Sequence, residues 1–339
     1  MKLINVGLVA DPASPTDIAR GMSDLDPPSG EARDAWDIEV VSEPFTMDCE
    51  DVETAVGRLQ DHAQHHEWDL VVGLTELPLR DESGVYLLIE TDPQRRTAVL
   101  SLPALGGIRT NARTRHAVRT LVHGMADAAS QDEQRVPLPR LTGRWRLLLG
   151  MVLANRPWRL VPGLKSALVA ALATGAIATI NSTVWLLAGS LSWWRLMVAT
   201  IAAVALVVGW VVIDGGLWDR PDDDSAGAKE RSRLYNTSTL MTLTAGVLIC
   251  YLALYLVNLA WALFVLDPAV MSGYLHAPLG YGDLFVLTWF VASAATVGGA
   301  LGTGLESDEA IRAAAYSKRE EERRERLARR RTTRRQRSK

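Results

Sequence analysis

Residues 196–213 read LMVATIAAVALVVGWVVI, a run of eighteen residues without a charged side chain. Three further apolar runs cover about Leu164–Ala188, Thr239–Leu266 and Leu284–Leu305. A helix needs about 20 apolar residues to cross the roughly 30 Å hydrocarbon core of a bilayer, and charged side chains are costly at its centre. The four runs therefore predict an all-α domain of four transmembrane helices within residues 163–305.

The charged residues between these runs predict the orientation of the helices. The connections Gly189–Trp194 and Asp267–Asp283 contain no Lys or Arg, whereas the second connection is basic, with Arg220, Lys229, Arg231 and Arg233. Arginines also precede the first run and follow the last. Because Lys and Arg are enriched in cytoplasmic loops, both termini are expected in the cytoplasm. The chain is predicted to be a multi-pass protein of the cell (inner or plasma) membrane, and its Arg- and Ala-rich composition is typical of bacteria.

Residues 140–162, before the first run, are predicted to form an amphipathic linker in the membrane interface. The apolar centre of this segment is too short to cross a bilayer, and Trp and Arg bracket it. Indole rings favour the headgroup level, and arginines there can meet anionic lipid. The residues that carry the prediction are Trp145, Trp158, Arg144, Arg146, Arg156 and Arg159.

Two features within the runs predict contacts between helices. Ala294, Gly298 and Gly302 are spaced four apart, which permits close approach of a neighbouring helix. That neighbour belongs either to the same bundle or to a second copy of the chain. Asn181 and Asn258 are polar residues inside apolar runs, and they are expected to form interhelical hydrogen bonds. The alternative is a conduction path, since polar residues at membrane depth often mark one.

Residues 1–139 have the composition of an acidic soluble domain. They hold 12 Lys and Arg against 24 Asp and Glu, so nucleic-acid binding is not expected. Alternating apolar patterns predict strands, and periodic patterns predict helices. Strands are expected at about Lys2–Val9, Trp36–Val41, Trp68–Leu74, Val85–Thr91 and Thr97–Leu102, and helices at Asp51–His66, at Thr110–Ala129 and from Ser14. These elements predict a mixed α/β domain with one central sheet, in which Asp92–Arg96 turns a hairpin.

Part of this domain resembles a known family of zinc peptidases. The stretches VVGLTELPL (71–79), Val85–Glu90 and AVLSLPAL (98–105), followed by a long helix, are similar to the core of archaemetzincins over about residues 68–130. The resemblance implies a zinc motif on the long helix, with three His ligands and a Glu base. Arg119, Thr120, His123, Ala126 and Ala129 occupy the positions of that motif. Two ligands and the base are missing, so the resemblance implies a fold retained without its chemistry.

Other signs of catalysis or cofactor binding are weak. His62 and His66, four residues apart, and His123 are the metal-ligand candidates, but imidazoles in the last turn of a helix also interact with the helix dipole. The first strand is followed by Asp11 and no Gly, which does not suit phosphate binding, and Gly106-Gly107 stands alone. The two cysteines, Cys49 and Cys250, predict no disulfide framework. No cofactor, metal or catalytic residue is predicted.

The tail, residues 306–339, contains 13 basic residues, and it is expected to attract anionic lipid. Three function hypotheses follow from the whole sequence. The first is a non-enzymatic, membrane-anchored interaction or regulatory module that binds a protein partner or a second copy of itself. The second is a small channel or transport subunit that its soluble domain regulates. The third is an enzyme whose α/β domain acts on a nucleotide-like or folate-like ligand.

Overall fold

The computed structural model describes residues 2–25, 34–46, 51–81, 83–92, 94–107, 109–126, 135–139, 142–221, 226–276 and 278–302. The basic tail and Cys49 lie outside these residues. The chain divides into two compact units, Met1–Ala154 and Asn155–Lys339. The first unit is a mixed α/β sheet domain, and the second is helical. Both fold classes agree with the sequence analysis.

A seven-stranded sheet forms the centre of the first unit, in the order β2-β1-β3-β6-β5-β4 with β7 also paired to β5. The parallel strands are β1 (Lys2–Ala10), β2 (Asp34–Ser42), β3 (Leu70–Thr75) and β6 (Thr97–Ser101), and the antiparallel ones are β4 (Leu79–Arg80), β5 (Tyr86–Asp92) and β7 (Arg135–Pro137). Every residue of β3 and β6 is buried, as expected of strands covered on both faces. The predicted hairpin between β5 and β6 is confirmed. β4 and β7 were not predicted, because strands of two or three residues carry too little pattern.

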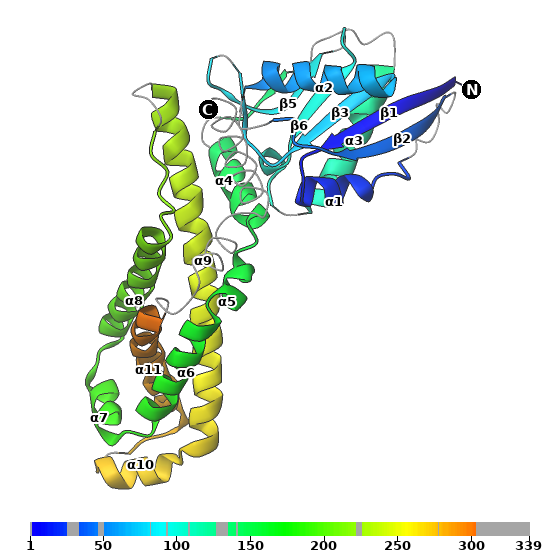
Figure 1. The fold of residues 1–339 in the computed structure, drawn as a ribbon. Helices are drawn as coiled ribbons and strands as arrows, with labels where there is room; N and C mark the ends of the chain where they lie inside the picture. The colour runs from blue at the N-terminus through cyan, green and yellow to red at the C-terminus, as the bar shows by residue number, and fades with distance from the viewer. Residues whose placement is uncertain are drawn as a thin grey trace, which may run out of the picture. The chain divides into compact units, whose positions relative to one another are not determined.

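Helices cover both faces of the sheet (Figure 1). α1 (Ser14–Arg20) and α3 (Thr110–Ala126) lie on one face, where Val118 and Leu121 pack in the core formed by β1, β3 and β6. α2 (Val52–His66) covers the other face with Val56 and Leu59. The carboxylate of Asp51 caps α2 by accepting a hydrogen bond from the Thr54 amide at 3.0 Å.

The indole of Trp68 packs directly on β1, at a position where only glycine fits. A Cβ atom added to Gly7 would lie 2.1 Å from Trp68 Cε3. The indole Nε1 donates to Glu39 Oε2 of the edge strand β2 at 2.7 Å, and the ring of His66 stacks on it at 4.5 Å. Trp68 therefore ties the end of α2 to two strands.

The helix α4 (Thr142–Ala154) belongs to the first unit, where it packs on the 3₁₀ helix η1 (Pro103–Leu105) that follows β6. Leu147 and Met151 are buried. Gly150 allows α4 to approach η1 closely, since a Cβ at this position would lie 2.2 Å from the carbonyl oxygen of Pro103. The predicted interfacial linker 140–162 is thus divided, and its first half is part of the α/β domain.

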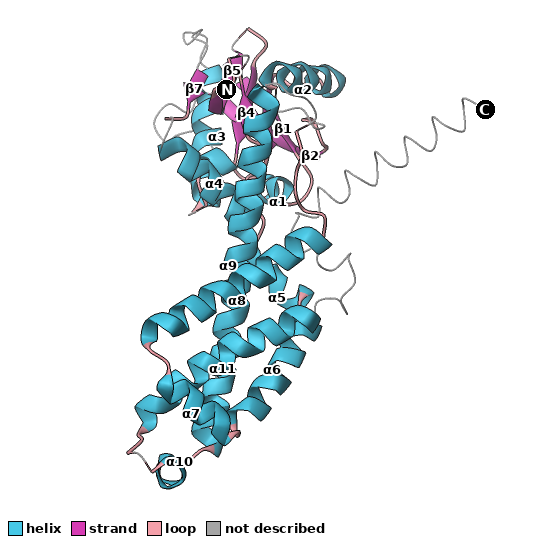
Figure 2. Ribbon diagram, turned by 90° about the vertical axis from the view of Figure 1, so that its left-hand side faces the viewer, coloured by secondary structure: helices cyan, strands magenta, loops and turns pink. Residues whose placement is uncertain are grey.

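The described part of the second unit consists of long and short helices joined by loops (Figure 2). Its elements are η2 (Pro157–Arg159), α5 (Leu160–Gly163), α6 (Lys165–Thr179), α7 (Ser182–Ser190), α8 (Trp193–Asp214), α9 (Ala226–Val265), α10 (Pro268–Leu275) and α11 (Tyr281–Gly302). Among the described residues, three helices are long and apolar enough to cross a membrane, namely α8, α9 and α11. The pair Thr142–Gly163 and Lys165–Thr179, which is bent by 57°, counts as a fourth only if it forms one broken span.

The first predicted run, 164–188, is not one helix. α6 ends at Thr179 and α7 begins at Ser182. The side chain of Asn181 accepts a hydrogen bond from the Thr183 amide at 2.9 Å, and the indole of Trp185 donates to the Thr179 carbonyl at 2.7 Å. Side chains therefore satisfy the backbone groups that the break exposes.

The helix α9 is longer than any membrane requires. Its 40 residues extend about 60 Å at 1.5 Å per residue. It begins at Ala226, well before the predicted span 239–266. Near its start, the Asn236 amide group exchanges two hydrogen bonds with the backbone of Asp219, at 2.8 and 2.9 Å. These bonds hold the connection after α8 against α9.

Replacement of Gly7 by Ala should destabilise the α/β domain. The added methyl group overlaps the Trp68 ring, and overpacking of this kind costs about 1–3 kcal/mol. Thermal unfolding of the detergent-solubilised chain would measure the loss. Gly57→Ala is the matched control, because space around Gly57 is open and Ala is the better helix former. Equal melting temperatures for the two variants would contradict the packing assigned to Trp68.

Candidate functional site

The loop that follows β6 lies at the carboxyl end of the parallel strands, where ligands bind in open α/β sheets. η1 occupies its first part, and Gly106 follows with a φ of 85°, a left-handed conformation that favours glycine. α3 then begins at Thr110, whose hydroxyl donates to the Gly106 carbonyl at 3.1 Å. The loop is therefore held between the sheet and the first turn of α3.

Two arginines converge on this loop. Arg113 Nη1 of α3 donates to the Leu105 carbonyl oxygen at 2.8 Å, and Arg146 Nη2 of α4 donates to the same oxygen at 2.9 Å. The two nitrogens thus lie within about 6 Å of each other, a separation at which like charges repel. Both side chains are exposed, and neither has a carboxylate partner within the part of the chain that the structure describes. We call Arg113 and Arg146 the arginine pair.

The arginine pair has the chemistry of an anion site. A guanidinium carries five N–H donors, and each member of the pair donates one to Leu105. The fixed fork of the remaining donors matches the oxygens of a carboxylate or a phosphate. An anion held there would also relieve the repulsion between the two charges. The arrangement can therefore bind an oxyanion, and it contains no nucleophile or base.

Charge is distributed unevenly over the α/β domain. The segment Arg109–Ala126 contains four arginines and no acidic residue, whereas the nine residues of β2 include three acidic residues and no Lys or Arg. One of these arginines, Arg115, is paired with Asp24 at 3.0 Å. The acidic average of residues 1–139 therefore conceals the basic helix α3, which the sequence analysis missed, whereas Arg144 and Arg146 of α4 were predicted as interface residues.

The carboxyl ends of β1 and β2 hold a second polar cluster, which is closed. Asp11 and Thr46 are fully buried, and the Thr46 hydroxyl donates to the Asp11 carboxylate at 3.3 Å. Thr16 Oγ1 donates to the Asp11 carbonyl at 2.9 Å and lies 2.8 Å from Ser42 Oγ. These bonds hold the loops after the two strands together, and the buried carboxylate offers no exposed surface to a ligand.

The predicted metal candidates on α2 face carboxylates of β2 and the loop that follows it. His62 Nε2 lies 3.5 Å from Glu43 Oε2, and His66 Nδ1 lies 3.7 Å from Glu39 Oε1. Across the described ranges, no group of three or more His, Cys, Asp or Glu side chains could hold a metal ion. The two histidines therefore act as partners of acidic residues.

The positions of the zinc motif fall on α3. Thr120, at the position of the base, is exposed and donates to the His116 carbonyl at 3.0 Å. Arg119 and His123 are half-buried. Ala126 ends the helix, and Ala129 lies outside the described residues. The resemblance to the zinc peptidases, and the loss of their chemistry that it implies, therefore stay predictions.

The predicted membrane-interface residues divide between the units. Trp145 of α4 is 61% exposed and lies in the first unit with Arg144 and Arg146. The remaining three, Arg156, Trp158 and Arg159, lie in or beside η2 in the second unit, where Trp158 is 51% exposed. Both indoles are thus available at a surface.

Small residues of α11 make a close contact with α6, and the tightest point lies one residue away from the predicted stripe. Ala294 is exposed and Gly298 is half-buried, and the side of Gly302 is not described. Gly299 makes the close approach, because a Cβ there would lie 3.0 Å from the Ala167 carbonyl oxygen of α6. A Cβ on Gly298 would lie 3.8 Å from Thr174 of α6, so this member of the predicted stripe also faces α6, at a looser distance than Gly299.

Asn258 is buried at the crossing of α9 and α6. Its amide nitrogen donates to the Leu254 carbonyl of its own helix at 2.8 Å. A Cβ on Gly175 would lie 2.4 Å from Asn258 Oδ1, so the two helices approach closely there. Asn181 caps α7 instead of bonding to another helix. Both asparagines have local packing or capping roles.

A network of four polar side chains joins three helices. Trp289 Nε1 of α11 donates to Thr200 Oγ1 of α8 at 2.8 Å. The hydroxyls of Thr200, Tyr251 and Ser293 lie 3.0–3.3 Å from one another. The sequence analysis missed this network, because its members are far apart in the chain and each stands singly in an apolar run.

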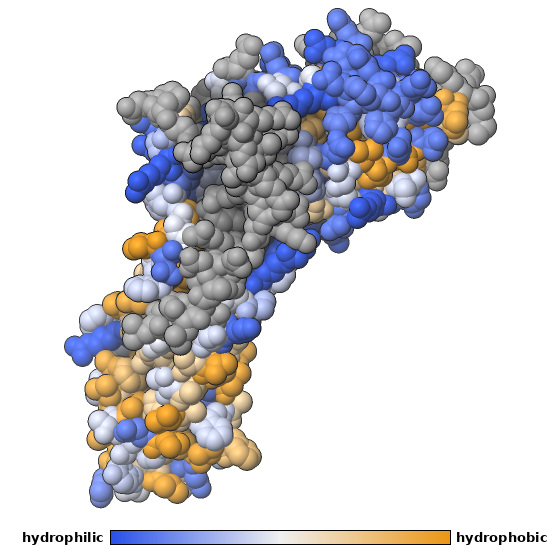
Figure 3. Space-filling model, in the orientation of Figure 1, coloured by the Kyte–Doolittle hydropathy of each residue, from blue (hydrophilic) through white to orange (hydrophobic). Residues whose placement is uncertain are grey.

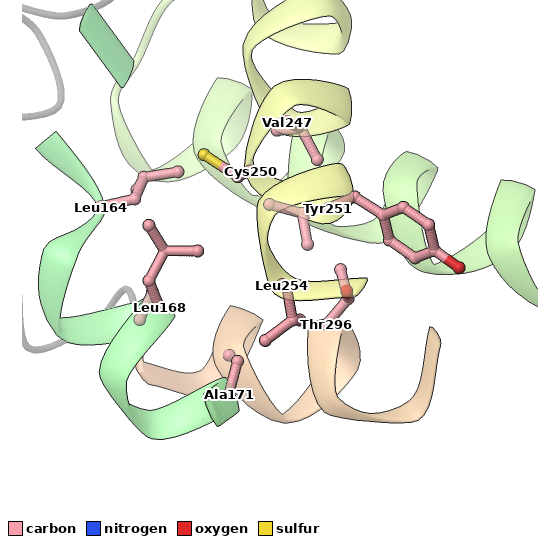
Figure 4. A pocket seen from close by; sticks show the side chains of 11 residues that line it. Leu164, Leu168, Ala171, Val247, Cys250, Tyr251, Leu254 and Thr296 are labelled. Carbon is pink, nitrogen blue, oxygen red and sulfur yellow. The ribbon is translucent and has the colours of Figure 1, made fainter. Parts of the chain in front are cut away.

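A small cleft of about 40 Å³ lies beside this network, between α6, α8, α9 and α11 (Figure 4). Its walls are apolar except at Cys250, Tyr251 and Thr296. Apolar spaces of this kind stay dry. The free thiol of Cys250 is buried there and has no chemical role in the arrangement.

Comparison with known proteins adds no relative to these observations: no protein-family model, curated protein or solved structure matches the chain.

Tyr251→Phe should destabilise the helical unit by about 0.5–1.5 kcal/mol, the range measured for hydrogen bonds between membrane helices. The substitution removes one hydroxyl from the four-membered network and leaves the ring in place. Tyr255→Phe is the control, since Tyr255 lies one turn later on α9 and makes no hydrogen bond to the described residues. Thermal melting in detergent would compare them, and equal effects would show that the network adds no stability.

Proposed function

We propose that the chain is an integral protein of the cell membrane whose α/β domain serves as a cytoplasmic interaction or regulatory module. One observation carries this proposal. Large apolar side chains on the outer faces of the helices are exposed, among them Ile177 at 68%, Ile213 at 82% and Phe264 at 87%. Soluble proteins rarely expose large contiguous apolar patches. If lipid hydrocarbon surrounds these faces, their apolar surface is not exposed to water, and the unfavourable free energy of that exposure is avoided.

The hydropathy of the surface supports this assignment. On the face that Figure 3 shows, hydrophobic side chains gather over the helices of the second unit, whereas hydrophilic ones dominate the α/β domain. α8 and α11 each contain 22 residues, so each extends about 33 Å, enough for a bilayer core of about 30 Å.

The positions of basic residues support the orientation. Lys229, Arg231 and Arg233 lie in the first turns of α9, before its apolar part. The connection between α9 and α11, which includes α10, carries no Lys or Arg. The positive-inside rule then places the start of α9 and the α/β domain in the cytoplasm and α10 outside.

A binding role fits the α/β domain better than catalysis. Its exposed feature is the arginine pair, which can bind an oxyanion, and its buried carboxylate Asp11 is closed off. The conduction hypothesis has no observation in its favour, since Asn181 and Asn258 serve as a helix cap and a packing residue.

Cysteine accessibility in intact cells would test the proposed topology. In a Cys49→Ser, Cys250→Ala background, Tyr274→Cys on α10 should react with an impermeant maleimide from outside. Asp61→Cys on α2 should react only after the cells are permeabilised. Both positions are exposed, so access and not burial decides the result. Labelling of Asp61→Cys in intact cells, or extraction of the chain by alkaline carbonate, would contradict the proposal.

A further inference from the structure

We infer that the arginine pair binds the phosphate of an anionic membrane lipid, so that the side of the α/β domain formed by the start of α3 and by α4 docks on the cytoplasmic leaflet. This inference rests on the proposed membrane insertion and deepens it by naming a partner. It concerns a folded site and is independent of the basic tail.

The first argument is the charge of the site. The two guanidiniums share the Leu105 carbonyl and have no described carboxylate to neutralise them. Arginine pairs bind phosphate oxygens with two parallel hydrogen bonds, which a single point charge cannot do. A lipid phosphate would neutralise the pair, and the inner leaflet presents such phosphates at high density.

The second argument is the apolar surface beside the charges. On α4, Trp145 is 61% exposed and Leu149 is 49% exposed, and the four-residue spacing places them on one face. Leu149 also lies three residues after Arg146, so it neighbours the pair. An indole and a leucine next to arginines suit the interface, where apolar side chains enter below the phosphates. A soluble phosphate ligand would leave these two side chains in water.

The third argument is the reach of the chain. Residues 155–164 alone separate α4 from α6, and ten residues extend at most about 36 Å. Within this link, Leu160 packs against α9 beside Gly246, in the apolar part of that helix. Part of the link is therefore taken up within the helical unit, so the stretch of chain that tethers the α/β domain to that unit is short.

The site depends on a precise local backbone. Gly106 has a φ of 85°, and a Cβ there would lie 3.3 Å from Arg146 Cγ and 3.4 Å from Arg113 Nη1. The glycine therefore leaves room for both guanidiniums over the same carbonyl. This placement comes from the folded loop and from α4 docking, which distinguishes the pair from a diffuse basic patch.

Fluorescence quenching in nanodiscs would test the inference on the full chain. In the background without native cysteines, Leu149→Cys carries an environment-sensitive fluorophore, and nitroxide lipids act as the quencher. With phosphatidylglycerol present, quenching should be strong and should fall as salt is raised. In phosphatidylcholine alone it should be weak. Equal quenching in the two lipids would overturn the inference.

Charge variants assign the effect to the pair. Arg113→Gln and Arg146→Gln should each lower the ratio of docked to undocked domain about fivefold, the factor that corresponds to about 1 kcal/mol per basic residue. The double variant should lose both factors. The control Arg20→Gln with Arg95→Gln removes the same charge from exposed positions on α1 and the β5–β6 turn. An equal loss of docking in this control would show that net charge alone drives the binding, and it would overturn the inference.

Lysine variants test whether charge alone is sufficient, and soluble competitors test whether the ligand is a free phosphate compound. Arg113→Lys with Arg146→Lys keeps both charges and should retain part of the docking if the fold is intact. At matched ionic strength, inorganic phosphate and ATP should not displace the domain from anionic lipid. Displacement by either would assign the pair to a soluble phosphate ligand. Correct topology at Tyr274 and Asp61 without any lipid response would overturn this inference alone and leave the membrane assignment intact.

Discussion

Polar groups inside an apolar helix bundle must find their hydrogen-bond partners among the other polar groups of the bundle. The apolar surroundings offer neither donors nor acceptors. This constraint explains two features of the second unit, although the buried Ser238 hydroxyl has no partner among the described residues. The break between α6 and α7 is possible because Asn181 and Trp185 satisfy the freed backbone groups. The hydroxyls of Thr200 and Ser293 find each other and Tyr251 across three helices. The helices must therefore be arranged so that these polar groups can reach their hydrogen-bond partners.

The α/β unit is organised by close backbone contacts. Gly7 admits the indole of Trp68 onto the sheet, and Gly150 admits α4 onto η1. The second contact has the wider consequence, because it places Arg146 over the carbonyl that Arg113 already binds. A helix that would otherwise be only a connector thereby completes an anion site. The close packing of Gly150 against Pro103 therefore determines where the guanidinium of Arg146 meets that of Arg113.

The sequence predicted features that depend on local pattern. Apolar runs located α8, α9 and α11, and alternation located the four long parallel strands and β5. It failed where a single side chain overrides the pattern, as Asn181 does in dividing residues 164–188. It also failed where the structure joins distant residues. Arg113 was not singled out, Arg146 was assigned to the membrane interface, and Gly106 was set aside as isolated, because only the fold brings the three residues to one carbonyl.

The helix α9 is fixed at two points along its length. Near its start, Asn236 holds the backbone of Asp219, and further on, Asn258 lies against Gly175 of α6. One inserted residue between these points would rotate them about 100° relative to each other around the helix axis. Both contacts could not then be kept. Over evolutionary time this stretch can accept substitutions at its exposed positions, but its number of residues is constrained, and length changes belong in the connections between helices.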